Sequence, residues 1–137
     1  MKIFDCTTFF NENLMLEVRF NILNKYVDKF VIAEAKYSHS GETKKLNFNI
    51  KKFSEFKSKI IYLVIENEPE NLNYQKNNNT IYEKDVDMRP NSIKRISLQR
   101  NKLLDALNEA DNEDYIFYSD NDEIPNLEGV DFEINQN

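Results

Sequence analysis

The sequence has few of the residues that mark several common protein classes. Its 137 residues include one cysteine, two glycines, three prolines and no tryptophan. The single cysteine, Cys6, cannot form an internal disulfide bond, which favours a reducing compartment. So little glycine and proline excludes collagen-like chains and proline-rich linkers. No apolar run approaches the roughly 18–20 residues of a membrane-spanning helix, and we expect a protein of the cytoplasm.

Basic residues are absent from the carboxyl-terminal part of the sequence. Residues 105–137 contain eleven Asp or Glu and no Lys, Arg or His, whereas residues 1–104 contain 18 basic and 13 acidic residues. The net charge of −6 is therefore polarised, and the acidic end would repel nucleic-acid phosphate. Clustered carboxylates could instead hold a divalent cation. On charge alone, a solvated acidic tail over 126–137 is the simpler interpretation.

Apolar residues are plentiful enough to bury a core. They make up 40% of the chain, with ten Phe and seven Tyr, and the length suits one domain over residues 1–137. Strands are predicted over 2–6, 30–35, 60–65 and 114–119. The run at 60–65, IIYLVI, has no polar alternation, which predicts a strand in the middle of a parallel sheet. The polar segment 66–92 is expected to be partly mobile or to hold a short hidden element.

Helices are predicted between these strands. The segment 14–27 also alternates like a strand, but fourteen residues without Gly or Pro favour a helix, capped by Asn11 or Asn13. A short helix is expected around Ile50, and a longer one from about 93 to 109, capped by Asn91 or Ser92. The core face of this longer helix is predicted to comprise Ile93, Ile96, Leu103, Leu107 and Ala110. Three polar residues are expected elsewhere on its surface, namely Arg95, Gln99 and Lys102.

The order of the elements predicts an α/β fold with a mostly parallel sheet flanked by helices. Such sheets bind ligands outside the carboxyl ends of their strands. Polar clusters follow three of the predicted strands, at 8–12, 34–41 and 120–123. We therefore expect these clusters to meet at one edge of the sheet.

Asp120 and Asp122 are separated by one residue just after an apolar strand. In extended backbone alternate side chains point the same way, so both carboxylates can face one cation. Two carboxylates leave positions open for water and phosphate oxygens, as Mg²⁺ sites usually do. An acidic turn without a ligand is about equally compatible with the pattern. A calcium loop of the EF-hand kind fits poorly, because Pro125 stands where that loop needs glycine.

Four stretches of the sequence occur in a recognisable order. They are KIFDCTTFFNE from Lys2, VIAEAKYSHSG from Val31, QRN at 99–101 and SDNDEIP at 119–125. Together they resemble glycosyltransferase family 17, over residues 2 to about 125. That family includes the enzyme that adds the bisecting β-1,4-linked N-acetylglucosamine to the core mannose of N-glycans, and many shorter bacterial and viral relatives.

The resemblance implies a GT-A-type fold that binds a nucleotide-diphosphosugar. It implies a UDP-sugar donor such as UDP-N-acetylglucosamine, a glycan or glycoconjugate acceptor, and a Mn²⁺ or Mg²⁺ cofactor. Asp120 and Asp122 would hold the metal, which stabilises the leaving UDP, and the anomeric carbon would invert. The donor would contact further residues of the four stretches, namely Phe9, Asn11, Glu12, Glu34, His39, Gly41, Arg100, Asn101 and Glu123. No catalytic base is assigned.

Most of these donor contacts have a structural alternative that the sequence leaves open. Arg100 suits phosphate oxygens through its guanidinium fork, but it could form a surface ion pair instead. Asn11 could cap a helix and Phe9 could pack in the core. Glu34 could bond a backbone amide. His39, the one histidine of the sequence, could be an ordinary loop residue.

The sequence also departs from its relatives. Asn121 stands where the family usually has an aliphatic residue, and the Glu that relatives carry before QRN is missing near Ile96. Relatives continue beyond the Asp-x-Asp motif into an acceptor-binding half, whereas twelve residues follow Pro125 here. We therefore expect a fold truncated after the Asp-x-Asp strand, whose exposed sheet edge would favour self-association as a homo-oligomer.

Three functions follow from these observations. The first is a metal-dependent, inverting glycosyltransferase that acts in the cytoplasm on a bacterial or viral glycan. The second is a truncated module that binds nucleotide-sugar and metal without turnover. The third is an unrelated α/β protein, such as a nucleotidyltransferase or a metal-dependent phosphotransfer domain.

Overall fold

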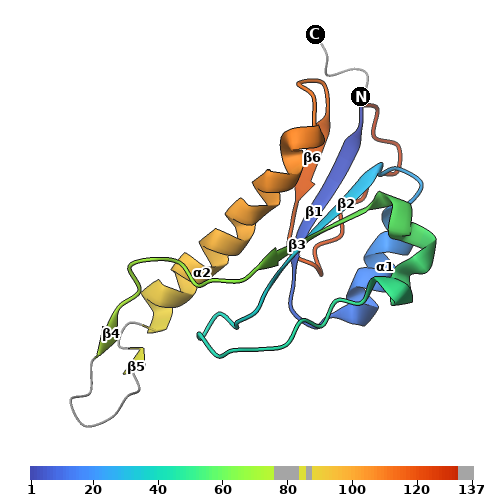
Figure 1. Cartoon of the computed structure of the whole chain (residues 1–137). Coiled ribbons are helices and arrows are strands. Elements are labelled where there is room, and N and C mark those ends of the chain that lie inside the picture. Colours follow the sequence, from blue (N-terminus) through green and yellow to red (C-terminus); the bar gives the residue numbers. More distant parts are fainter. Residues whose placement is uncertain (76–83, 86–87, 133–137) are drawn as a thin grey trace.

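A computed structural model of the chain describes residues 1–75, 84–85 and 88–132 (Figure 1). The elements are, in chain order, β1 (Ile3–Phe9), α1 (Asn13–Leu23), β2 (Lys29–Ala35), η1 (Ile50–Lys59), β3 (Ile60–Ile65), β4 (Tyr74–Gln75), β5 (Lys84–Asp85), α2 (Met88–Lys102), η2 (Leu103–Glu109) and β6 (Tyr115–Tyr118). The elements η1 and η2 are 3-10 helices. No helix in the described ranges has both the length and the apolar character to cross a membrane.

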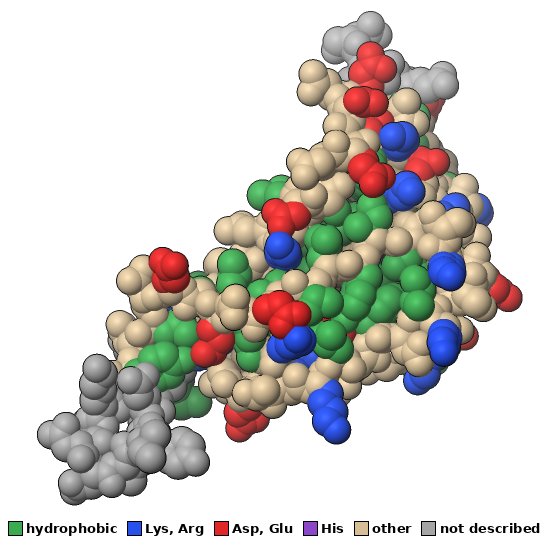
Figure 2. Space-filling model, in the orientation of Figure 1, with side chains coloured by type: hydrophobic (Ala, Val, Ile, Leu, Met, Phe, Trp, Pro, Cys, Tyr) green, Lys and Arg blue, Asp and Glu red, His purple; other side chains and the backbone are tan. Residues whose placement is uncertain are grey.

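Four of the strands form one parallel sheet in the order β3-β2-β1-β6. The predicted α/β class and parallel sheet are therefore confirmed. The predicted place of β3 is wrong, because it is an edge strand and β1 and β2 occupy the centre. Five of the six residues of β3 are only half-buried, and Figure 2 shows apolar side chains gathered over this edge. An unbroken apolar run indicates two covered faces, but it does not tell whether a neighbouring strand is present on each side.

One face of the sheet packs against α1 and η1, and the other against α2 and η2 (Figure 1). The α1 face is largely aromatic. Phe20 is fully buried, with its ring centroid 4.5 Å from that of Phe30, 5.2 Å from Phe53 and 5.3 Å from Phe56. Each such ring contributes about 1.5–3 kcal/mol through burial, and the tilted and edge-to-face pairs add to it.

The α2 face of the sheet is built from smaller side chains. Its core comprises Phe4, Cys6, Val31, Ala33, Ala35, Tyr37, Ile65, Leu103 and Ala106. Burial, with a smaller effect of the Asp5 carboxylate, raises the pKa of the Cys6 thiol to about 12. The thiol therefore stays protonated, and Cys6 is the small buried side chain that its apolar surroundings require.

The core face predicted for the long helix is wrong toward its amino end and confirmed toward its carboxyl end. The residues of α2 that are buried are Asn91, Arg95 and Gln99, whereas Ile93 is 54% exposed. A spacing of four residues places these three polar side chains on one face of the helix. They can be buried because partners are present: Arg95, for example, donates to a carboxylate, a hydroxyl and a carbonyl. At the carboxyl end, Leu103 is buried and Leu107 and Ala110 pack, partly buried, against the same core, as predicted.

The first strand and first helix differ from their predicted bounds. Thr7, Thr8 and Phe9 belong to β1, where they pair with β2, instead of starting a loop. Neither of the predicted caps is used, because the position before α1 is Glu12 and no side chain caps the helix. The Glu12 carboxylate instead accepts the backbone N–H groups of residues 10 and 11, which closes a tight turn between β1 and α1.

The polar segment after β3 holds a short element that the sequence did not identify. Tyr74–Gln75 pairs antiparallel with Lys84–Asp85. The mobility expected for 66–92 concerns in part residues 76–83 and 86–87, which lie outside the described residues. The predicted acidic tail is described as far as 132 and contributes to the core. Leu127 is buried, and the Phe132 ring lies 5.0 Å from that of Tyr115.

Candidate functional site

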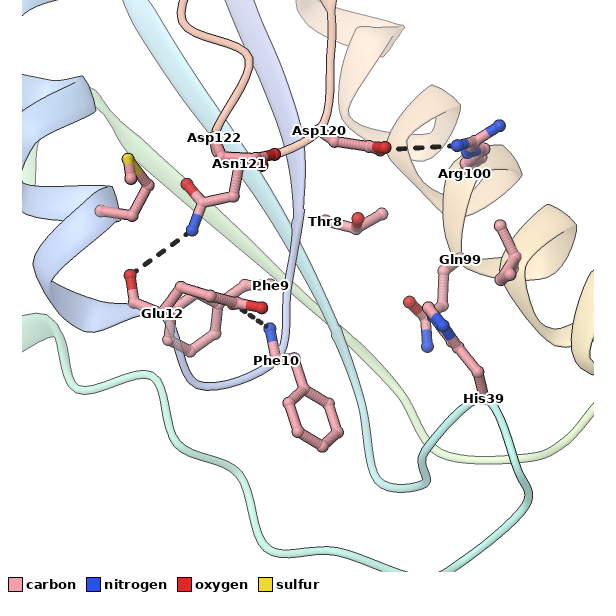
Figure 3. A pocket seen from close by; sticks show the side chains of 12 residues that line it. Thr8, Phe9, Phe10, Glu12, His39, Gln99, Arg100, Asp120, Asn121 and Asp122 are labelled. Atoms are coloured by element: carbon pink, nitrogen blue, oxygen red, sulfur yellow. Dashed lines mark hydrogen bonds and ion pairs between the residues drawn. The ribbon is translucent and has the colours of Figure 1, made fainter.

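A pocket of about 370 Å³ opens at the carboxyl ends of β1 and β6 (Figure 3). It is lined by Thr8, Phe9, Phe10, Glu12, Met15, His39, Ile96, Gln99, Arg100, Asp120, Asn121 and Asp122. These residues come from the end of β1, the start of α1, the loop after β2, the middle of α2 and the loop after β6. The three polar clusters predicted to meet at this edge of the sheet therefore do so.

The pocket collects some of the residues expected from the sequence and leaves others outside. Those at the pocket are Phe9, Glu12, His39, Arg100, Asp120 and Asp122. Those that do not line it are Asn11, Glu34, Gly41, Asn101 and Glu123. Six lining residues were not predicted as site residues, namely Thr8, Phe10, Met15, Ile96, Gln99 and Asn121. Thr8, Phe10, Gln99 and Asn121 carried a usable signal, because each lies next to an expected site residue.

Glu34 is fully buried and its carboxylate is surrounded by donors. It accepts from Lys44 Nζ at 2.6 Å and from the Tyr62 hydroxyl at 2.8 Å. It also accepts the backbone N–H groups of Asn47 at 2.7 Å and Phe48 at 3.0 Å. The structural alternative for Glu34, a bond to backbone amide, is thus present twice, and the side chain anchors the 44–48 segment to the sheet.

Gly41 does not line the pocket but packs against Arg95, which holds the loop of His39. Its φ of +89° lies in the left-handed region, and a Cβ here would be 2.5 Å from Arg95 Nη2. Arg95 is fully buried and donates to Glu68 at 2.6 Å and to the backbone carbonyl of His39 at 3.1 Å. Ser92 Oγ donates to the same carbonyl at 2.8 Å. The loop that carries the histidine is therefore tied to α2.

Asp120 meets two side chains from the α2 side of the sheet. Arg100 Nη2 lies 3.4 Å from Asp120 Oδ1, and the Tyr118 hydroxyl donates to the same oxygen at 3.2 Å. The guanidinium also lies over the Tyr118 ring, 5.4 Å from its centroid. Burial raises the pKa of the Tyr118 hydroxyl, and the neighbouring Arg100 only partly opposes this, so the hydroxyl stays a donor. The Arg100 and Asp120 side chains are each about half exposed, so this ion pair is weak and easily exchanged.

The loop after β6 is a tight turn. The backbone N–H of Glu123 donates to the carbonyl of Asp120 at 2.9 Å, and Ser119 Oγ donates to the Glu123 carbonyl at 2.6 Å. Asn121 Nδ2 reaches the carbonyl of Glu12 at 3.4 Å, which joins the loop to the start of α1. Glu123 thus shapes the loop, while the residues at 120 and 122 line the pocket.

The two aspartates fit a hard divalent cation of the Mg²⁺ or Mn²⁺ type. Both residues line the pocket and both are exposed, so water and phosphate oxygens could complete the coordination shell of an ion held there. Among the described residues, no group of three or more His, Cys, Asp or Glu side chains is arranged to hold a metal. Two aspartates therefore suit a metal ion that a bound ligand also coordinates. They do not suit a structural metal site in which protein side chains supply every ligand.

The side of the pocket opposite the aspartates carries an aromatic ring and the histidine (Figure 3). Phe10 is 42% exposed, and Lys44 Nζ lies 5.2 Å from its ring centroid. An exposed ring beside an ammonium group offers a stacking surface for a planar group. The Glu12 carboxylate, which accepts two backbone amides, is committed to the turn.

Comparison with known proteins gives one match. Residues 1–134 match the family model described as Glycosyltransferase family 17. Neither the curated proteins nor the solved structures compared with the chain include a match. The matched range contains the sheet, both flanking layers and the whole pocket.

Proposed function

The chain belongs to glycosyltransferase family 17, and we propose that it transfers a sugar from a UDP-sugar donor to a glycan hydroxyl with the help of a divalent metal ion. N-acetylglucosamine is the proposed sugar, and inversion at the anomeric carbon is the proposed stereochemistry. The observation that carries the proposal is that Asp120, Asp122 and Arg100 line one pocket at the carboxyl edge of a parallel sheet. That edge is where α/β sheets bind nucleotides.

The two aspartates would hold the metal against the diphosphate of the donor. Bound there, Mn²⁺ or Mg²⁺ would neutralise the charge that develops on the departing UDP. The carbonyls of Asp120 and Glu123 are engaged within the turn, so the carboxylates are the natural ligands that this loop offers. Both residues are exposed at the pocket, and the one ion pair of Asp120, with Arg100, is weak, so a charged ligand can reach both aspartates.

Arg100 would supply a second positive charge for the diphosphate. Its present partner, Asp120, is only weakly held at 3.4 Å, and its ring contact with Tyr118 keeps the guanidinium near the pocket. A metal ion on the aspartates would release the guanidinium toward phosphate oxygens, which its fork matches well. On the opposite side of the pocket, Phe10 would stack on the base or on the sugar.

Calorimetric titration of UDP, with and without Mn²⁺, tests this proposal. The wild-type chain should bind UDP only with the metal present. The variant Asp120→Asn/Asp122→Asn should lose at least about tenfold in affinity, a change of about 1.4 kcal/mol, since it removes both carboxylate ligands of the proposed metal. Binding of UDP that is indifferent to both Mn²⁺ and the double substitution would contradict the proposal.

The sequence offers a matched control for this test. Asp111 and Glu113 have the same one-residue spacing around an asparagine, and both are exposed away from the pocket. The variant Asp111→Asn/Glu113→Gln removes the same two charges from the molecule. It should bind UDP and Mn²⁺ like the wild type, which would separate a local metal site from an effect of net charge.

The fate of the sugar distinguishes the enzyme from a binding module. An enzyme should release UDP from UDP-N-acetylglucosamine when a glycan acceptor is added, and the product should carry the inverted linkage. Metal-dependent binding of UDP without any transfer would support the module without turnover. No residue of the pocket is assigned as the base that the acceptor hydroxyl requires.

A further inference from the structure

Arg19 is a fully buried charged residue inside the apolar face of α1. Its Nε donates to Asp5 Oδ2 at 2.8 Å and its Nη2 donates to Asp5 Oδ1 at 2.7 Å. Asp5, in the central strand β1, is itself 2% exposed. The two side chains therefore form a bidentate ion pair that fixes the plane of the guanidinium.

The remaining guanidinium N–H groups point at the loop after β6. Nη2 donates to Ser119 Oγ at 2.7 Å, and Nη1 donates to the carbonyl of Asp120 at 2.8 Å. Nη1 also reaches the carbonyls of Asn121 at 3.3 Å and Glu123 at 3.4 Å. One side chain thus contacts four of the five loop positions from 119 to 123, about 100 residues away in the sequence.

This arrangement sets which way the loop faces. The carbonyls of Asp120 and Asn121 turn toward the buried guanidinium, while the side chains at 120 and 122 line the pocket. A short turn without its own sheet partners could adopt several conformations of similar energy. The charged donor beneath it favours the one in which three carbonyls converge on a single point.

We propose that Arg19 is a positioning residue that holds the 119–123 loop in the conformation presenting Asp120 and Asp122 to the cation. The claim that this positioning serves a cation rests on the proposed metal-dependent function. The claim that Arg19 holds the loop does not, and it can be tested without metal. Arginine is required because only a planar fork can grip Asp5 in two places and still reach the loop; lysine retains the charge but has a single nitrogen.

Amide hydrogen exchange followed by mass spectrometry tests the positioning, in metal-free protein. In Arg19→Lys, exchange of the peptides covering 119–124 should accelerate at least tenfold, while β2 keeps its wild-type rate. The matched control is Arg95→Lys, which alters the other fully buried arginine and its carboxylate partner but leaves this loop untouched. Unchanged loop exchange in Arg19→Lys, or equal acceleration in both variants, would overturn the inference.

A milder substitution keeps the inference testable if Arg19→Lys does not fold. Ser119→Ala removes the hydroxyl between Nη2 and the Glu123 carbonyl but leaves the ion pair with Asp5 in place. Loop exchange should then rise about threefold, and a wild-type rate would overturn the inference.

Binding of Mn²⁺, measured by electron paramagnetic resonance of the free ion, connects the loop to the function. Affinity should fall about tenfold in Arg19→Lys and stay within twofold of the wild type in Arg95→Lys. If the wild-type chain binds Mn²⁺ neither alone nor with UDP present, the proposed metal-dependent function fails, while hydrogen exchange still decides whether Arg19 holds the loop. A loosened loop with undiminished Mn²⁺ affinity would overturn the claim that the positioning serves the cation.

Discussion

The two faces of the sheet bury different kinds of side chain. Aromatic rings fill the α1 face, where Phe20 contacts three other phenylalanines. The α2 face combines small apolar residues of the sheet with a polar stripe of α2, and it leaves Ile93 and Leu104 more than half exposed. The larger buried rings indicate that the α1 face buries more apolar surface, while α2 contributes polar side chains to its own face and to the pocket.

Each face also encloses one fully buried arginine, and the two have different targets. Arg19 joins the α1 face to the loop that carries Asp120. Arg95 joins α2 to the loop that carries His39 and to the segment before β4. Both therefore connect a helix to a loop at the carboxyl edge of the sheet. A buried charge is costly without partners, so each pair specifies one arrangement of its loop even if its net contribution to stability is small.

Phe20→Ala should have the largest effect on stability. Removing this ring leaves a cavity among three other rings, and the free energy of unfolding should fall by about 3–5 kcal/mol. Leu104→Ala is the counterpart on the side of α2 and η2. Because Leu104 is 61% exposed, its loss should change stability by no more than about 0.5 kcal/mol. Urea denaturation measures both, and similar losses in the two variants would refute the proposed asymmetry.

Glu34→Gln should come next, and it tests whether this residue belongs to the scaffold or to the donor site. The neutral amide cannot satisfy four donors, including Lys44, so stability should fall by about 2–4 kcal/mol. The affinity of the folded variant for UDP with Mn²⁺ should match that of the wild type. A tenfold loss of affinity in the folded fraction would instead assign Glu34 to the donor, as the family resemblance implied.

Gly41→Ala examines the α2 side, where Arg95 packs against the glycine. The new Cβ would lie 2.5 Å from the guanidinium, and the φ of +89° is strained for any other residue, so unfolding should become easier by about 2–3 kcal/mol. Gly129→Ala is the matched control, because its φ is +74° and no atom of the described residues lies within 4 Å of the added Cβ. It should lose only about 1 kcal/mol from backbone strain. Equal losses of stability in Gly41→Ala and Gly129→Ala would show that the Arg95 side chain moves away from the added Cβ without cost.

Much of the scaffold is predictable from the sequence, since apolar runs of the right length specify buried strands. The order of strands and helices, the parallel sheet and the meeting of polar clusters at one edge all follow from that pattern. The position of β3 at the edge does not, because its apolar residues look the same whether or not a further strand adjoins them.

The buried arginines are what sequence reasoning passed over. A binary pattern assigns charged residues to the surface, so Arg95 was expected there and Arg19 was not considered. Yet Arg19 stands three residues after Leu16 and one before Phe20, at a core position of the helix, and Arg95 lies midway between Asn91 and Gln99. A charge at core spacing is a usable signal, but its partners come from residues about 14, 27 and 100 positions away, which no local pattern reveals.

Asp114→Asn should have the smallest effect, because Asp114 belongs to neither face. It lies just before β6, at the end of the sheet away from the pocket, and accepts the backbone N–H groups of Asp111 and Lys2. These two bonds, Asp111 first, lower the pKa of Asp114 below its usual 3.8. Folding therefore favours the carboxylate, and the stabilisation is present above that value and lost as the pH falls through the lower pKa of the folded state.

The consequence is a pH-dependent difference between the wild type and Asp114→Asn. The variant should be slightly less stable at neutral pH, and the difference should vanish in acid below the lowered pKa of the folded state, where the wild-type carboxyl is protonated as well. Urea denaturation at several pH values measures it, with Glu113→Gln as a control that removes the same charge from the exposed neighbour. A difference that persists unchanged in acid would mean that Asp114 acts through its shape and not through its charge. In that case the link between β1 and β6 at this end would depend on the geometry of the turn alone.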